Sequence, residues 1–73
     1  MDYVDRLTAL REDRDIGQKA VAQLLNCSQS TVSKFEKRRT SYTIEDLMIL
    51  CKFYQVSADY VLGLPADLPY PER

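Results

Sequence analysis

The chain has 73 residues, of which 45% are hydrophobic and 29% are charged, which is typical of one folded domain rather than a disordered segment. Its longest uninterrupted apolar run, Leu47 to Cys51, is far shorter than the roughly 20 residues that cross a bilayer. Asp2 and Asp5 stand where a secretory signal would be basic, so we expect a cytoplasmic protein.

Side chains that commonly build catalytic and metal sites are scarce. The chain has no histidine and only two cysteines, Cys27 and Cys51, which is too few for a disulfide framework and a poor basis for a zinc site. We expect both thiols to act as small apolar side chains in the core. With no glycine-rich phosphate loop and no nucleophile beside a base, we expect no metal, no cofactor and no enzymatic activity.

The charge is unevenly distributed along the chain. The net charge is −1, yet residues 28–42 carry four basic side chains against one acid, while the rest of the chain sums to −4. A single basic face on an acidic body suits a protein that contacts nucleic acid in one orientation. The alternative is that these cations only complement the dipole at the end of a helix.

The apolar spacing predicts a helix over residues 2–13, followed by a second over 18–25. Asp2 is a candidate N-cap for the first helix, whereas Gly17 leaves the second without a side-chain cap. The inward positions are predicted to be Val4, Leu7 and Leu10 in the first helix and Val21, Ala22 and Leu25 in the second.

A third helix is predicted over residues 29–38, capped by Ser28 and burying Val32 and Phe35. Asn26 is suited to a left-handed residue at the end of the preceding helix. Since only residues 26–28 separate the two helices, we expect them to cross steeply.

Two further helices are predicted over residues 44–54 and 58–62. Thr43 and Asp46 predict a capping box for the first, with Tyr42 and Leu47 as a hydrophobic staple, and Ser57 caps the second. The first is expected to bury Ile44, Leu47, Leu50 and Cys51. The fold class is therefore all-α, a compact five-helix domain over residues 1–64, followed by a proline-rich tail over 65–73.

The outward face of the helix over 29–38 carries amides, hydroxyls and ammonium groups instead of salt-bridged Glu and Lys pairs. These groups match the base edges exposed in the DNA major groove, where a Gln amide fits adenine and a Lys ammonium fits guanine. The candidates for base readout are Gln29, Ser30, Ser33 and Lys34.

A second set of side chains is suited to the DNA backbone. An amide at the start of the second helix lies beside free N–H groups, and cations and hydroxyls leave the third helix toward the following loop. The candidates for phosphate contacts are Gln18, Thr31, Lys37, Arg38, Arg39, Thr40, Ser41 and Tyr42.

The run Gln18-Lys-Ala-Val-Ala-Gln-Leu-Leu-Asn-Cys-Ser-Gln-Ser-Thr-Val-Ser-Lys-Phe-Glu resembles the Xre family of lambda-repressor/Cro-like helix-turn-helix domains. The later Thr-Ile-Glu-Asp-Leu and Val-Ser-Ala-Asp-Tyr-Val-Leu-Gly fit the same pattern, so the resemblance extends from about Leu7 to Leu64. It implies five helices and binding of double-stranded DNA as a two-fold dimer on an inverted-repeat operator. It also implies that Gln18 holds a phosphate, that Gln29, Ser30 and Lys34 face bases, and that Arg11 and Glu36 form a structural ion pair.

Some positions depart from the family pattern. Gly17 replaces the usual Ser or Thr cap, and Arg38 stands where Gly or Asn is usual, which is costly if the backbone there is left-handed. Leu24 and Ile49 occupy positions that are usually polar, and we interpret them either as isolated surface side chains or as part of a partner surface.

The leading hypothesis is a sequence-specific transcriptional regulator, specifically a repressor of the phage or mobile-element type that binds DNA as a homodimer. A second is the antitoxin of a toxin–antitoxin pair, and a third is a protein-interaction module that has lost DNA binding. The candidate dimer or partner surface comprises Leu24, Ile49, Tyr54, Tyr60, Leu64, Leu68 and Tyr70.

Overall fold

The computed structural model describes residues 1–65, and this part of the chain folds into five α-helices without a strand. Their order is α1 (Tyr3–Asp13), α2 (Gln18–Leu25), α3 (Gln29–Glu36), α4 (Ile44–Tyr54) and α5 (Ala58–Leu62). The predicted all-α, five-helix fold class is therefore confirmed. The expected tail lies outside the described residues except for Pro65.

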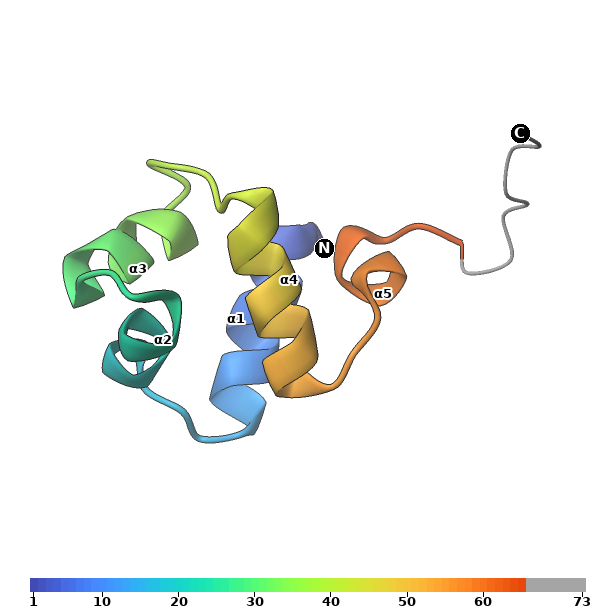
Figure 1. Cartoon of the computed structure of the whole chain (residues 1–73). Coiled ribbons are helices and arrows are strands. Elements are labelled where there is room, and N and C mark those ends of the chain that lie inside the picture. Colours follow the sequence, from blue (N-terminus) through green and yellow to red (C-terminus); the bar gives the residue numbers. More distant parts are fainter. Residues whose placement is uncertain (66–73) are drawn as a thin grey trace.

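In Figure 1, α1 and α4 form the middle of the molecule, with α2 and α3 at one end and α5 at the other. The core between them draws on every helix. Its most completely buried side chains are Val32 from α3, Leu50 from α4 and Val61 from α5. Since apolar burial is the main favourable term in folding, this shared core fixes the position of α3 relative to the rest.

Side-chain caps start four of the five helices. Asp2 and Asp5 form a capping box at α1, Thr43 and Asp46 form another at α4, and Ser28 and Ser57 cap α3 and α5. Each cap accepts a hydrogen bond from a backbone N–H that lacks an intrahelical partner. The exception is α2, because Gly17 provides no side-chain cap, as its sequence predicts.

The predicted inward positions of the first three helices are confirmed, since each has a relative exposure of 9% or less. One prediction for α4 is wrong: Ile44 is 77% exposed, although its spacing suggested burial. The core side of α4 is formed by Leu50, Tyr54 and the half-buried Leu47, and Ile44 lies roughly a quarter turn away from their mean direction.

The two cysteines are free thiols that are half-buried and pack against the core. Burial raises the pKa of both thiols, which keeps them protonated at neutral pH. Within residues 1–65 no cluster of three His, Cys, Asp or Glu side chains is arranged to hold a metal ion. None of the helices described for residues 1–65 combines the length and apolar character that a bilayer span requires.

Candidate nucleic-acid interface

Helices α2 and α3 form a helix-turn-helix unit. Asn26 ends α2 with a left-handed backbone (φ 57°), and the N–H of Cys27 donates to the carbonyl of Ala22 at 2.9 Å. This turn matches the role predicted for Asn26 and brings the buried Ala22 and Val32 into one core. The outward side of α3 is thereby held at a fixed orientation on the body of the protein.

The first turn of α3 carries a connected group of hydroxyls. Ser28 Oγ accepts from the N–H of Thr31 at 3.2 Å and lies 3.0 Å from Ser30 Oγ and 2.9 Å from Thr31 Oγ1. The hydroxyls predicted to contact DNA at Ser30 and Thr31 are thus hydrogen-bonded to the cap. Both hydroxyls keep acceptor capacity, but Ser28 has one proton and can donate to only one of them, so at least one of the two uses its own proton on the cap.

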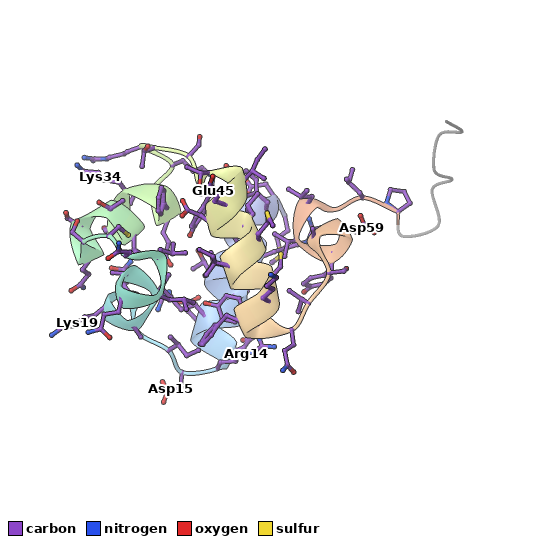
Figure 2. All side chains as sticks on the ribbon, in the orientation of Figure 1. Arg14, Asp15, Lys19, Lys34, Glu45 and Asp59 are labelled. Carbon is purple, nitrogen blue, oxygen red and sulfur yellow. The ribbon has the colours of Figure 1, made fainter. Side chains whose placement is uncertain are left out.

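Gln29 and Lys34 lie on the exposed side of α3, whereas Ser33 is half-buried. In Figure 2, Lys34 points away from the body of the molecule, on the same end as Lys19 of α2. Among residues 1–65, neither Gln29 nor Lys34 has a side-chain hydrogen bond or ion pair within the chain. Both are therefore available to an external partner.

Glu36, the last residue of α3, connects three helices. Its Oε2 accepts from Arg11 Nε at 2.7 Å, and its Oε1 accepts from Arg11 Nη2 at 3.1 Å and from Gln18 Nε2 at 2.9 Å. Arg11 also donates to the carbonyl of Ile16 at 2.9 Å, and its bond to Glu36 raises the pKa of its guanidinium. The amide of Gln18, predicted to hold a phosphate, is thus oriented by Glu36, and the second N–H of its Nε2 and its backbone N–H remain as donors at the start of α2.

The ring of Tyr42 is more buried than its place in the loop suggested. Its ring stacks on Phe35 with 4.3 Å between centroids and meets Tyr3 edge-on at 6.3 Å. Burial raises the pKa of its hydroxyl, with the nearby Glu36 adding to the effect. The ring therefore packs inward and joins the loop to the core, and the hydroxyl of Tyr42 stays only a predicted phosphate contact.

The end of α3 also differs from the prediction. Helix α3 ends at Glu36 rather than Arg38, with Lys37 as its C-cap. Arg38 has a left-handed backbone (φ 61°), and its guanidinium donates to Asp2 and Asp5 at 2.8–3.2 Å. Lys37, Arg39, Thr40 and Ser41 are exposed and form no side-chain hydrogen bond within residues 1–65, whereas Arg38 is exposed but ion-paired and Tyr42 is half-buried.

The predicted partner surface is only partly exposed. Tyr54 is wrong as a surface residue: it is 3% exposed, and Arg14 donates to its carbonyl at 3.1 Å and lies over its ring. Leu24 is half-buried against the core, whereas Ile49, Tyr60 and Leu64 are exposed by 38%, 53% and 50%. Leu68 and Tyr70 lie outside the described residues.

The structure exposes an apolar groove that the sequence did not predict. This α4–α5 groove has a volume of about 430 Å³, and its lining is almost entirely apolar. It is lined by Ile44, Leu47, Met48, Cys51, Lys52, Ala58 and Leu62. The spacing of Ile44, Met48 and Lys52, four residues apart, was the available signal for one continuous face.

The sequence is similar to a known domain family and to two bacterial regulators. The family described as a helix-turn-helix domain matches residues 2–62. The chain is 31% identical over 65 residues to the uncharacterized HTH-type transcriptional regulator YobD of Bacillus subtilis, covering 89% of this chain and 58% of YobD. It is 29% identical over 63 residues to the HTH-type transcriptional activator BcrR of Enterococcus faecalis, covering 86% of this chain and 31% of BcrR.

Two solved structures share the fold. The P22 c2 repressor, crystallised with a synthetic operator, superimposes with a TM-score of 0.73 and 31% identity over 85% of this chain and 94% of its own. A transcriptional regulator from Listeria innocua has a TM-score of 0.81 at 23% identity, over 96% and 65% of the two chains, which speaks for the fold alone. The chain spans 58% and 31% of the lengths of the two regulators matched by sequence. Since the family match covers all five helices of residues 1–65, the chain belongs to the helix-turn-helix domain family, and its pattern is that of the Xre-like members.

Proposed function

We propose that this protein is a transcriptional regulator that binds double-stranded DNA in a sequence-specific manner, with α3 in the major groove. The observation that carries the proposal is the exposed side of α3, where Gln29 and Lys34 have no partner within residues 1–65 while Val32 and Phe35 anchor the opposite side. A recognition helix needs both properties, because polar groups must reach base edges from a backbone that does not move.

The backbone contacts are proposed to come from two places flanking α3. The start of α2 offers Gln18, oriented by Glu36, and the loop after α3 offers Lys37, Arg39, Thr40 and Ser41. Such contacts give affinity and register, whereas Gln29, Ser30, Ser33 and Lys34 would discriminate between bases. The P22 c2 repressor, which was solved with a synthetic operator, supports DNA binding by this fold through its similarity.

The operator-bound form is proposed to be a homodimer that packs through the α4–α5 groove. Figure 1 places α5 at the end of the molecule away from α2 and α3, so this contact leaves both copies of α3 free. Met48 and Leu62, exposed by 55% and 43%, are then covered by the second copy. Two helices α3 about one helical turn of DNA apart would read the halves of an inverted repeat, and repression would follow from blocking polymerase.

The test is selection of bound fragments from a random DNA library, followed by sequencing and by titration of the enriched site at several salt concentrations. An enriched inverted repeat is the expected result, and its half-site spacing gives the dimer geometry. Enrichment of a single half-site would refute the dimer but keep sequence-specific binding. Absence of any enrichment would refute sequence-specific binding and favour a protein partner, as in an antitoxin.

A further inference from the structure

Arg38 is half-exposed and pairs with two carboxylates at the start of α1. Its Nη2 donates to Asp2 Oδ1 at 2.9 Å and to Asp5 Oδ1 at 2.8 Å, while its Nε donates to Asp2 Oδ2 at 3.2 Å. Arg38, Asp2 and Asp5 together form the Arg38 cluster. The first turn of α1 is thereby joined to the segment that directly follows α3.

The left-handed backbone of Arg38 distinguishes it from Lys37 and Arg39 on either side. The N–H of Arg39 donates to the carbonyl of Lys34 at 2.9 Å, which closes the end of α3 and requires the left-handed φ of 61° at Arg38. This conformation is unfavourable for a residue other than glycine. Lys37 and Arg39 on either side are exposed and form no ion pair within residues 1–65, whereas Arg38 is paired.

The charges of the Arg38 cluster do not favour a polyanion. Two carboxylates face one guanidinium, so the cluster carries a net charge of −1, and the guanidinium lowers the pKa of Asp2, which keeps that carboxyl ionised at neutral pH. A carboxylate offers a guanidinium the same planar pair of acceptors that a phosphate offers. Asp2 and Asp5 thus occupy three of the five guanidinium N–H groups, those on Nε and Nη2, including the Nε/Nη2 edge that would pair with a phosphate.

We propose that Asp2 and Asp5 act as an intramolecular substitute for phosphate, which withholds Arg38 from the DNA backbone and so limits sequence-independent affinity. The inference rests on the proposed DNA binding. Its consequence is selectivity: each phosphate contact strengthens binding to every sequence alike, so removing one from the loop lowers non-specific affinity while base readout by α3 is unaffected.

The test compares two double variants that change the net charge equally. Asp2→Asn/Asp5→Asn removes the carboxylates from Arg38 but keeps an N-cap oxygen at residue 2, since Asn caps about as well as Asp. Asp13→Asn/Asp15→Asn is the matched control, because these exposed acids form no side-chain hydrogen bond or ion pair within residues 1–65. Far-UV circular dichroism and urea unfolding establish that each variant is folded.

Binding of each variant to a duplex of random sequence is measured over a range of salt concentrations. We expect Asp2→Asn/Asp5→Asn to steepen the slope of log K against log salt by about 0.9, the value for one phosphate, and to tighten binding about five- to tenfold at 0.1 M salt. The control pair should change the slope much less. Adding Arg38→Gln to Asp2→Asn/Asp5→Asn should remove the extra slope.

Single variants provide the opposite check. Arg38→Gln alone should leave the slope unchanged, whereas Arg39→Gln should flatten it by about 0.9. If Arg38→Gln flattened the slope as much as Arg39→Gln, Arg38 would already contact phosphate and the proposal would be refuted. Equal effects of the two double variants would also refute it, because net charge alone would then account for the change.

The salt dependence of the wild-type protein distinguishes a failure of the proposed function from a failure of this inference. A wild-type protein whose binding does not depend on salt would overturn both the proposed function and this inference. A wild-type protein that binds normally, with the slopes unaffected by residues 2 and 5, overturns the inference alone. The Arg38 cluster is also measured without DNA, because Arg38→Gln should raise the pKa of Asp2 in NMR titrations.

Discussion

Arg11 and Glu36 form a bidentate ion pair across α1 and α3, with side chains that are 15% and 12% exposed. Because the pair is largely removed from water, loss of one partner leaves the other with an unmatched charge. We expect Glu36→Gln to lower the free energy of unfolding by about 2–3 kcal/mol, measured by urea denaturation. Glu12→Gln, an exposed change on α1, should stay within about 0.5 kcal/mol, and a similar loss in both variants would contradict a special role for the pair.

Base readout and phosphate contact should separate experimentally. Gln29→Ala is expected to weaken the best operator by about 1–3 kcal/mol while leaving random DNA nearly unaffected, since it removes only a base contact. Arg39→Ala should weaken all sequences alike and flatten the salt dependence. Titrations of both variants on operator and random duplexes check this division of roles, and identical behaviour on the two duplexes would show it to be mistaken.

The α4–α5 groove should control self-association. Met48→Lys places a charge on the exposed apolar wall of the groove, so we expect it to shift the protein toward the monomer in analytical ultracentrifugation and to reduce cooperative binding to an inverted repeat. Phe53→Lys is the matched control, because Phe53 is 48% exposed but lies about 140° around α4 from Met48. Loss of the dimer in Phe53→Lys but not in Met48→Lys would place the interface elsewhere.

Gln55 offers a stabilising substitution. It ends α4 with a left-handed backbone (φ 57°), is exposed, and forms no side-chain hydrogen bond within residues 1–65. Gln55→Gly removes the Cβ that disfavours the left-handed conformation and loses little packing. We expect the free energy of unfolding to rise by about 0.5–1 kcal/mol. Gln55→Ala should give no comparable gain, because alanine retains the Cβ that disfavours this conformation.

The Arg38 cluster should contribute a pH-dependent part of stability. Hydrogen bonding to Arg38 lowers the pKa of Asp2 below that of the unfolded chain, about 3.9, so the stabilisation is complete above that value and is lost as pH falls through the folded pKa. The difference in unfolding free energy between wild type and Arg38→Gln should therefore be constant near neutrality and shrink below about pH 4. Urea titrations across that range check it, and a difference that persists at about pH 2 would contradict the assignment to Asp2.

Local features of the sequence were sufficient for the helices and most of their ends. Asp2, Ser28, Thr43 and Ser57 cap the helices that they were predicted to cap, because each cap bonds to a backbone group only three residues away. Asn26 and Gly63 adopt the left-handed conformations that their residue types favour. The end of α3 was placed two residues too far, because arginine does not itself favour a left-handed turn, although the family pattern has Gly or Asn at this position.

Apolar spacing did not predict which side of α4 faces the core. Apolar side chains occur on all sides of this helix, so spacing alone did not decide that Tyr54 is buried and Ile44 exposed. The burial of Tyr54 depends on contacts with other helices: Arg14 at the end of α1 donates to the carbonyl of Tyr54 and lies over its ring. Tyr42 turns inward for the same reason, because Phe35 and Tyr3 provide it with an aromatic site.

The sequence by itself determined five helices, their caps and the polar outward side of α3, because these depend on residues within one or two turns of each other. Only the tertiary structure decided that Arg38 pairs with Asp2 and Asp5, more than 30 residues away, and that α4 and α5 enclose a groove. The physical reason is that long-range pairs form only after the core has packed α1, α3 and α4 together, and nothing in a local pattern records which side chains then meet.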